Sequence, residues 1–447
     1  MLKLSVFMSP TGGHVGGWRH PDAVVDAGFN YDRWIEFARL VERGKFDMMF
    51  LADGNGVNGI ENRDLLSRNP ATRPVVIEPI CLLSALAAAT TRVGLVGTTT
   101  TTYDQPFSVA RRFAALDWLS KGRAGWNVVT TSNPQDAKNF SREEHLEHSD
   151  RYARAGEFVD VVKGLWDSWA DDAFLFDKEN GLFLDGDKVR LLDHRGEHFS
   201  VRGPLNSARP PQGHPVIVVA GASESAMELA ARTADVIFTV TDTKEAAQKF
   251  YADVKGRLAK YGRSEDELKV FPGASIFVGP TAQDAENLYR QLQELIPESV
   301  GIQVLGKVVG MDLSNCSPED PLPELPETVG IRSFRNMLYE LSRRDGLNIR
   351  QLYQRVLPAR GHVLFKGDAK QVVDEMESWY RDKACDGFNV VAPYLPGGLE
   401  AVVDHVIPEL QRRGLFRTEY EGTTLRDSLG LKRPANPYFA DESAAAA

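Results

Sequence analysis

Cysteine is scarce in this sequence, and long hydrophobic runs are absent. The three cysteines among 447 residues, Cys81, Cys316 and Cys385, are too few for a disulfide framework and show no metal-ligand spacing. We therefore expect reduced thiols, no metal site and a cytoplasmic location. The longest apolar stretches, such as 80–89 and 215–222, are far shorter than the roughly 20 residues of a membrane helix. We expect neither a membrane-spanning segment nor a signal peptide.

Positive charge is also in the minority. The chain has 52 Lys and Arg against 62 Asp and Glu, a formal net charge of −10, and it contains no block of basic residues. This balance argues against nucleic acid and anionic membrane surfaces as partners. The apolar fraction of 43% is ordinary for a globular protein, which excludes disordered and fibrous classes.

Short apolar runs alternate with longer amphipathic patterns along most of the chain. The helical pattern is clearest in Tyr31–Arg43, where apolar residues recur every three or four positions. Apolar strands joined by helices predict a parallel sheet covered on both faces, and eight such units favour a closed (β/α)₈ TIM barrel of the α/β class. The eight predicted strands are 4–8, 46–52, 92–98, 125–130, 216–220, 236–240, 270–278 and 387–392.

Four stretches do not fit this minimal repeat. They are rich in Gly, Pro, Asn, Asp and Ser, and the first two directly follow predicted strands, so we expect them at the catalytic face. We interpret all four as insertions in a single barrel over residues 1–435, followed by a flexible tail at 436–447. The insertions are 54–78, 131–149, 171–214 and 297–366.

A glycine-rich motif and an aspartate follow the second predicted strand. Residues 54–59 match the G-x-G-x-x-G pattern of dinucleotide sites, but no helix opens directly after them, so we interpret them as a flexible loop. Asp53 stands at the carboxyl end of that strand, where barrel enzymes place functional groups. A turn or capping role explains Asp53 equally well.

Polar residues also end the third and fourth predicted strands. Five threonines, 98–102, are suited to a polar ring edge or a phosphate, although β-propensity and helix capping explain them too. Asn127 lies inside an apolar strand, where an unpaired amide costs on the order of 1–3 kcal/mol. It therefore indicates either a ligand or a structural partner.

Two histidines and a tyrosine begin the next helical pattern. His145 and His148 are three residues apart, but no third ligand accompanies them, so zinc is disfavoured. His148 and Tyr152 would share one helix face, and the Tyr152 hydroxyl is suited to a phosphate. The alternative is that both are simply exposed surface residues.

Two βα junctions complete the set of candidate residues. Ser223 begins a helix after strand 216–220, and a helix N-terminus with small residues accepts phosphate, although many βα junctions look the same. His14 lies in a glycine-rich loop after the first strand, which is typical of an active-site loop.

Taken together and in this order, these motifs resemble one known family. The chain resembles the nitrilotriacetate, EDTA, dibenzothiophene-sulfone and long-chain-alkane monooxygenases of the bacterial-luciferase-like flavin superfamily. The resemblance runs from Trp18 to Gly414, and its most specific part is Gly122–Thr130. Other carrying motifs are Trp18-Arg19-His20-Pro21, Phe50-Leu51-Ala52-Asp53, His148-x-x-Arg151-Tyr152 and Ala220-Gly221-Ala222-Ser223.

The resemblance implies a two-component monooxygenase. Such an enzyme takes reduced FMN (FMNH₂) from a separate NAD(P)H:FMN reductase and reacts it with O₂ to form a C4a-peroxyflavin. It then oxygenates a small organic substrate: a xenobiotic, an organosulfur compound or an aminopolycarboxylate. The family also implies a homo-oligomer, either a dimer or a tetramer.

The resemblance further implies roles for single residues. Asp53 and Thr98 match residues at the flavin ring, His148 and Tyr152 match a pair around the flavin phosphate, and Ser223 matches the phosphate-binding turn.

The alkane-oxidising branch gives two further comparisons. His14 matches its histidine near the reacting face, which implies a catalytic role. That branch also has a cysteine near the position of Thr11 and a histidine near Ser132, and their absence here argues against a long-chain alkane substrate.

The sequence leaves other functions open. Proteins of the same fold bind the deazaflavin F420 and transfer hydride without O₂, although the segment 126–130 favours FMN. A non-catalytic flavin-binding protein is a further alternative. An open Rossmann dehydrogenase is disfavoured because the glycine motif opens no helix.

Overall fold

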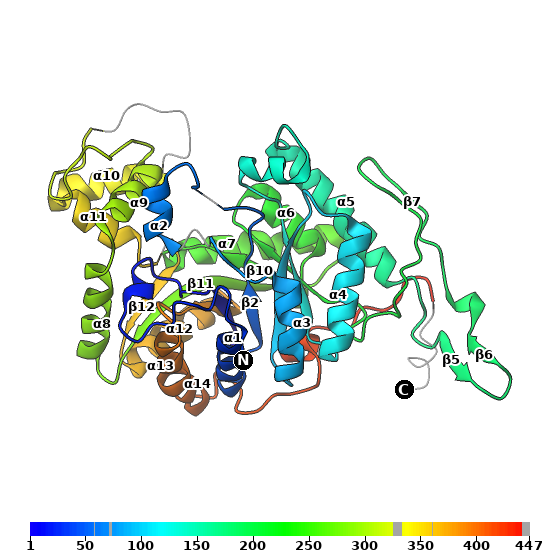
Figure 1. Cartoon of the computed structure of the whole chain (residues 1–447). Helices are drawn as coiled ribbons and strands as arrows, with labels where there is room; N and C mark the ends of the chain where they lie inside the picture. The colour runs from blue at the N-terminus through cyan, green and yellow to red at the C-terminus, as the bar shows by residue number, and fades with distance from the viewer. Residues whose placement is uncertain (58, 71–73, 325–332, 360, 440–447) are drawn as a thin grey trace.

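Eight parallel strands close into a barrel in the computed structural model (Figure 1). The structure describes residues 1–57, 59–70, 74–324, 333–359 and 361–439, without the side chains of 333–337. Strand β1 pairs with β13 and β13 pairs with β11, which closes the ring. In ring order the strands are β1 (Lys3–Met8), β2 (Met48–Leu51), β3 (Gly94–Thr100), β4 (Ala124–Val129), β9 (Val216–Ala220), β10 (Val236–Thr239), β11 (Lys269–Val278) and β13 (Gly387–Val391).

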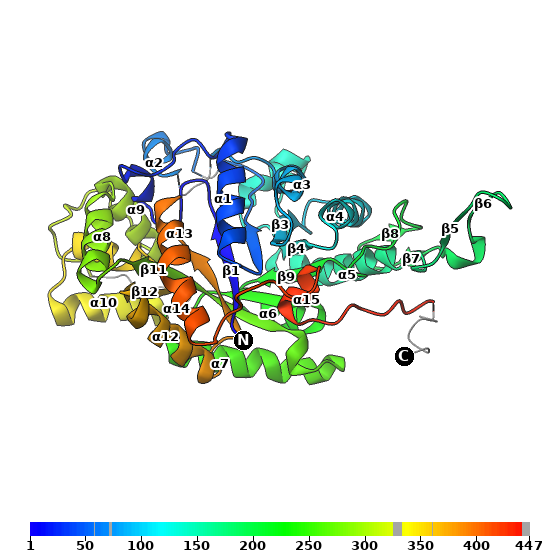
Figure 2. The same ribbon diagram turned by 90° about the horizontal axis from the view of Figure 1, so that it is seen from below.

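Helices surround this ring on its outer face (Figure 2). All eight predicted strands are present, so the predicted (β/α)₈ barrel is confirmed. The surrounding helices are α1 (Tyr31–Arg43), α3 (Pro79–Ala89), α4 (Pro106–Ser120), α5 (His148–Trp166), α6 (Glu224–Thr233), α7 (Lys244–Arg257), α8 (Ala282–Glu294), α12 (Ala369–Arg381), α13 (Gly397–Ala401) and α14 (Ile407–Arg412). None of the described helices is long and apolar enough to cross a membrane.

Phenylalanines fill the inside of the barrel. The rings of Phe7, Phe50 and Phe238 come from three different strands, and their centroids lie 5.7–6.0 Å apart. Below them, the short helix α15 (Leu425–Leu429) packs apolar side chains against the interior. The barrel therefore has a solid apolar floor, and a ligand has room only at its carboxyl-end mouth.

A ninth strand was not predicted. β12 (Val363–Gly367) pairs only with the upper half of β11, outside the closed ring. It lies at the end of the stretch 297–366, which we predicted to be wholly an insertion. Leu364 and Lys366 of this strand are exposed, so the run lacks the continuous apolar character of the barrel strands.

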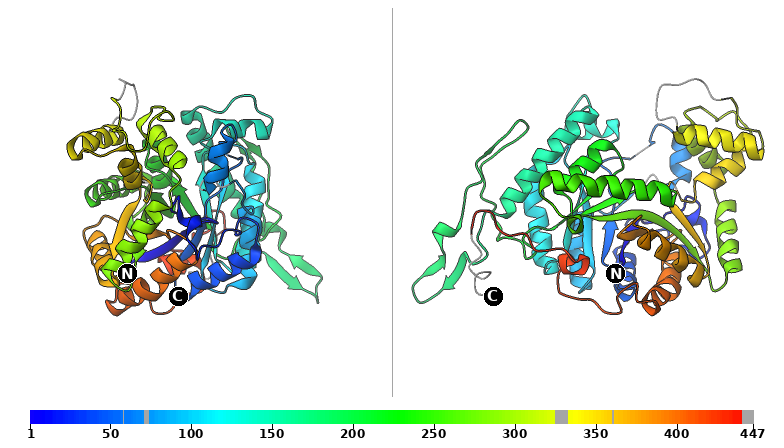
Figure 3. Two further views of the ribbon diagram at one scale, coloured as in Figure 1. Left: turned by 60° about the vertical axis from the view of Figure 1, so that its left-hand side comes forward. Right: turned by 180° about the vertical axis from the view of Figure 1, so that it is seen from behind.

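The insertion that precedes β12 forms a helical unit. Helices α9 (Glu298–Val309), α10 (Ser333–Asp345) and α11 (Ile349–Val356) pack around an apolar cluster of their own that includes Val300, Leu352 and Tyr353. A different insertion builds an arm of two hairpins, β5 (Phe174–Asp177) with β6 (Leu182–Leu184) and β7 (His194–Arg195) with β8 (Ser200–Val201). Figure 3 shows the arm and the helical unit on opposite sides of the barrel.

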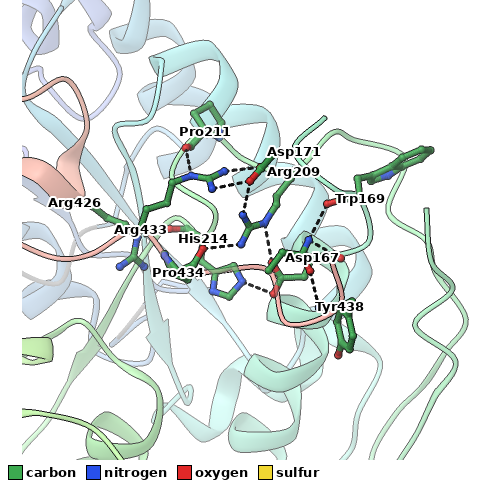
Figure 4. A network of polar contacts seen from close by, with 11 residues as sticks. Asp167, Trp169, Asp171, Arg209, Pro211, His214, Arg426, Arg433, Pro434 and Tyr438 are labelled. Atoms are coloured by element: carbon green, nitrogen blue, oxygen red, sulfur yellow. Dashed lines mark hydrogen bonds and ion pairs between the residues drawn. The ribbon is translucent and has the colours of Figure 1, made fainter. Parts of the chain in front are cut away.

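Ion pairs attach the C-terminal segment to the end of α5 (Figure 4). Arg433 pairs with Asp171 (2.6 Å), and Arg209 donates to the backbone oxygen of Pro434 (2.8 Å). Arg209 also donates a hydrogen bond to Asp167 (2.9 Å), which contacts His214 (2.7 Å). Asn436 donates to the backbone oxygen of Trp169 at 2.9 Å. The predicted tail 436–447 lies largely outside the described residues.

Candidate active site

A polar cavity of about 410 Å³ opens at the carboxyl ends of four barrel strands. Its walls come from the loop after β2, from β3, from β4 and the loop after it, from the end of β9, from the first turns of α5, and from Leu229 of α6. The cavity therefore gathers segments that lie far apart in the sequence. Four of the six predicted site residues line it: Asp53, Thr98, His148 and Tyr152.

Asp53 and Thr98 lie on neighbouring strands of the barrel. Asp53 stands two residues beyond the last residue of β2, and Thr98 lies within β3. The Thr98 hydroxyl donates to the backbone oxygen of Leu51 at 2.7 Å and accepts from the Asn127 amide at 2.8 Å. These two bonds fix the Thr98 side chain toward the barrel interior.

The two polar atoms of the Asn127 side-chain amide differ in their hydrogen bonding. Its Nδ2 donates to Thr98, so a structural partner, one of the two alternatives that the sequence left open, is present. Its Oδ1 is buried without a hydrogen-bond partner among the described residues, and the residue is only 2% exposed. A buried acceptor left unpaired is costly, so this oxygen is suited to an N–H group of a bound ligand.

His148 and Tyr152 share one face at the start of α5, as their spacing predicts. Their ring centroids lie 4.9 Å apart. The Tyr152 hydroxyl points toward the junction before α6, where it lies 3.9 Å from the place that a Cβ on Gly221 would occupy. Gly221 has a φ of +148°, a conformation that favours glycine, and the missing side chain keeps this space open.

Ser223 and His14 do not line the cavity. Ser223 is the N-cap of α6, and its hydroxyl accepts from the Ala226 N–H at 3.2 Å. His14 is 3% exposed, accepts from the Gly16 N–H at 3.0 Å, and meets Phe277 edge-on at 6.2 Å. The roles that the resemblance implies for these two residues stay predictions.

Arg151 is the site residue that sequence reasoning missed. It is the only lysine or arginine among the described residues that line the cavity. Its guanidinium donates to the backbone oxygen of Thr131 and contacts Nε2 of His145. The signal was available in the motif His148-x-x-Arg151-Tyr152, whose arginine we had given no role.

His145 orients this arginine as a neutral imidazole. Arginine has only donors, so Nε2 of His145 must accept from Arg151. The proton is then on Nδ1, which donates to the Tyr103 oxygen at 2.7 Å. Burial, and next the neighbouring positive charge of Arg151, lower the pKa of His145 and so favour the neutral form.

The described residues contain no cluster of three or more metal-ligating side chains. His145 and His148, whose spacing gives only a weak indication of zinc, make different contacts. His145 bonds to Tyr103 and Arg151, whereas His148 packs against Tyr152.

The two ends of the cavity suit the two ends of a flavin mononucleotide. Arg151 and Tyr152 line the cavity, and the N-terminus of α6 begins just beyond Gly221, which the Tyr152 hydroxyl faces; together they favour a dianionic phosphate. The side chains of Asp53 and Thr98, which line the cavity, and the unpaired Asn127 oxygen behind Thr98 offer polar partners for a ring edge. The residues present therefore fit FMN.

Known proteins of similar sequence match almost the whole chain. The family described as luciferase-like monooxygenase matches residues 7–315. N-acetyl-S-(2-succino)cysteine monooxygenase of Bacillus subtilis (strain 168) is 49% identical over 440 residues, which cover 98% of each chain. Nitrilotriacetate monooxygenase component A of Aminobacter aminovorans is 48% identical over 443 residues, which cover 97% of each chain.

Solved structures give the same result. The crystal structure of a long-chain alkane monooxygenase superposes with a TM-score of 0.84 at 34% identity, covering 96% of this chain and 95% of that one. A riboflavin lyase solved with modified FMN and riboflavin gives a TM-score of 0.81 at 29% identity, covering 97% and 96%.

Proposed function

The chain belongs to the luciferase-like monooxygenase family, and we propose that it oxygenates a small organic molecule with O₂ and reduced FMN. One observation carries the proposal. A single cavity at the barrel mouth is lined by the cation Arg151 and by Thr98, and behind Thr98 lies the buried, unpaired oxygen of Asn127. These are the two kinds of contact that a flavin phosphate and a flavin ring require.

Different residues would hold the phosphate and the ring of the cofactor. Arg151, Tyr152 and His148 would hold the phosphate, with Ser223 presenting the N-terminus of α6. Asp53, Thr98 and Asn127 would orient the ring at the barrel mouth. The bound flavin supplies the activation of O₂, and the protein supplies binding, orientation and exclusion of water.

His14 is proposed to hold or deliver a proton at the reacting face. Its burial and its hydrogen bond to the Gly16 N–H support a ring held in one orientation. Because that bond places the lone pair on Nδ1, the neutral ring carries its proton on Nε2. A proton donor of fixed direction suits a step that must outcompete side reactions.

A separate NAD(P)H:FMN reductase is the proposed partner. The relative from Aminobacter aminovorans is named component A, which supports an enzyme of more than one component. We further propose a homo-oligomer and a cytoplasmic location, as the sequence led us to expect.

The names of the relatives do not agree on a substrate. They name a succinylated cysteine, nitrilotriacetate and a long-chain alkane, two of which are polyanions and one of which is apolar. These names therefore assign no substrate to this chain.

Equilibrium binding tests the cofactor assignment. We would titrate the purified chain with reduced FMN and with reduced F420 under anaerobic conditions, following flavin fluorescence. FMN should bind at least tenfold more tightly than F420, and Arg111→Gln, an exposed control on α4, should leave both affinities unchanged. Preference for F420 would favour the hydride-transfer alternative, and FMN binding without any O₂-dependent turnover would favour a binding protein.

A further inference from the structure

The arm formed by β5 and β6 exposes large aromatic side chains to solvent. The hairpin extends away from the barrel (Figure 3). Phe176 is 61% exposed and Phe183 is 64% exposed, and their ring centroids lie 5.1 Å apart. Trp118, near the end of α4, is 50% exposed and borders the same hollow of about 750 Å³ as these two rings. Single exposed apolar side chains are ordinary, but a cluster of large ones indicates an interaction surface.

Contacts within the arm hold these rings in place. Phe174 packs against Trp169 at a centroid distance of 5.1 Å and stacks with Phe176 at 6.0 Å. The Trp169 indole donates to the backbone oxygen of Leu205 at 2.7 Å. Phe176 has a φ of +51°, which bulky side chains rarely adopt, and lies where the register between β5 and β6 shifts. Aromatic side chains that are already oriented lose little entropy on binding, which is typical of the anchor residues of interfaces.

The projecting rings and an apolar hollow lie side by side on the same chain. The hollow is also lined by Trp118, Trp169, Pro210 and Pro211. Two copies related by a two-fold axis can each insert their rings into the hollow of the other, since a two-fold interface is self-complementary. Charge does not oppose this contact: residues 171–214 contain six Lys and Arg against eight Asp and Glu, so two arms repel each other little.

The exposed apolar area is large enough for a stable dimer. At about 200 Å² for a whole aromatic side chain, Phe176, Phe183 and Trp118 expose roughly 350 Å². Leu175 and Leu182 of the same hairpin, each about half exposed, add roughly 100 Å². Reciprocal docking of two copies would therefore bury roughly 900 Å² of apolar area. Because about two-thirds of a homodimer interface is apolar, the total would be roughly 1,400 Å², and stable interfaces bury about 1,200–2,000 Å².

We propose that this surface, formed by β5, β6 and the hollow beside them, binds a second copy of this chain. The inference rests on the homo-oligomer of the proposed function and names the surface that holds it. Permanent interfaces are more apolar than transient ones, so a reductase that delivers flavin and dissociates is a poorer occupant. Residues 440–447, whose sequence is ADESAAAA, are also poorer, because they contain no aromatic or large aliphatic side chain.

Sedimentation equilibrium of the full chain over a dilution series tests the proposal. Wild type should be a dimer or a larger oligomer. The double variant Phe176→Asp, Phe183→Asp places carboxylates in the apolar contact, so it should raise the dissociation constant at least about thirtyfold. Phe29→Asp is the matched control: Phe29 is 73% exposed in the loop before α1, so the same substitution there should leave the constant unchanged. Equal circular dichroism spectra would show that each variant folds.

Hydrogen–deuterium exchange locates the contact independently of any variant. Exchange of residues 174–184 should be slower in concentrated wild-type protein than in diluted protein, and removal of residues 440–447 should not change this difference. A monomeric wild type, an unchanged dissociation constant in the double variant, or exchange that accelerates only when residues 440–447 are removed would overturn the proposal.

The affinity for reduced FMN separates this inference from the flavin assignment. The hollow and the flavin cavity share no lining residue in the part of the chain that the structure describes, so the double variant should bind FMN as wild type does. A wild type that dimerises through the arm without binding FMN would contradict the flavin assignment alone. A wild type that binds FMN as a monomer would contradict the docking surface alone.

Discussion

The guanidinium of Arg151 donates to Nε2 of His145, and this contact holds the only Lys or Arg side chain of the described cavity lining in place. His145 is held in turn by Tyr103, whose ring stacks on Phe140 at 4.6 Å. The loop after β4 is thus fastened to the end of β3 and to the start of α5. An exposed arginine is ordinarily mobile, but this one is pre-oriented for an anion.

Arg151→Gln should weaken FMN binding by about tenfold to a hundredfold, the effect of losing a charge-assisted hydrogen bond. Arg151→Lys should recover only part of the affinity, because lysine has a single terminal nitrogen and cannot contact His145, Thr131 and the phosphate together. Fluorescence titration of FMN measures both variants. Equal affinity in wild type and Arg151→Gln would remove this residue from the site.

FMN binding should weaken as the pH falls through the pKa of His145. Burial and Arg151 hold that pKa below its ordinary value of about 6.5, so the ring is neutral at pH 7 and accepts from Arg151. Protonation at lower pH abolishes the acceptor and places two cations in contact. A His145→Gln variant has an acceptor at every pH, so its FMN affinity should lose this dependence. The same slope in both proteins would contradict the role of His145.

The roles of Ser223 and Tyr152 can be distinguished by comparing the unfolding free energy of each variant with its affinity for FMN. Ser223→Ala removes the N-cap bond to Ala226, which should cost about 1 kcal/mol of unfolding free energy. Tyr152→Phe removes a hydroxyl that lines the cavity, so it should lower FMN affinity several-fold with little change in stability. Urea denaturation and FMN titration measure the two quantities. If Ser223→Ala affects stability alone, the hydroxyl of Ser223 does not contact the phosphate.

The ion pairs at the end of α5 should be important for stability. Asp167 is 2% exposed, and Arg209→Met would leave its carboxylate buried with only His214 as a side-chain partner. Removing one member of a buried pair typically costs about 3–5 kcal/mol. Arg433→Met is the matched control: its partner Asp171 is a third exposed, so the loss should be about 1 kcal/mol or less. Equal losses in urea denaturation would contradict this ranking.

The barrel was predictable because its strands carry a strong local signal. Runs such as Val216–Ala220 are apolar throughout, which is what a parallel strand covered on both faces requires. β12 was missed for the converse reason, since Leu364 and Lys366 alternate outward. The helical unit was predicted only as an insertion, because its helices bury their apolar faces against one another rather than against the barrel.

The cavity was predictable in part. Asp53 follows β2 and Thr98 lies in the last half of the neighbouring β3, and the carboxyl ends of barrel strands meet at one mouth, so their proximity follows from the fold. Arg151 has no such signal, because an arginine in the first turn of a helix looks like any solvated side chain. His145 contacts Arg151 only because the loop 131–149 folds back toward the start of α5.

If this chain binds reduced FMN and controls its reaction with O₂, the flavin should reoxidise differently in the presence of the protein. Anaerobic stopped flow tests it most directly: the chain is mixed with reduced FMN, then with aerated buffer, and flavin absorbance is followed. Reoxidation should be slower than for free FMN, with a transient spectrum distinct from both the oxidised and the reduced forms, and both effects should be lost in Arg151→Gln. Reoxidation at the rate of free FMN, with wild type and variant alike, would contradict it.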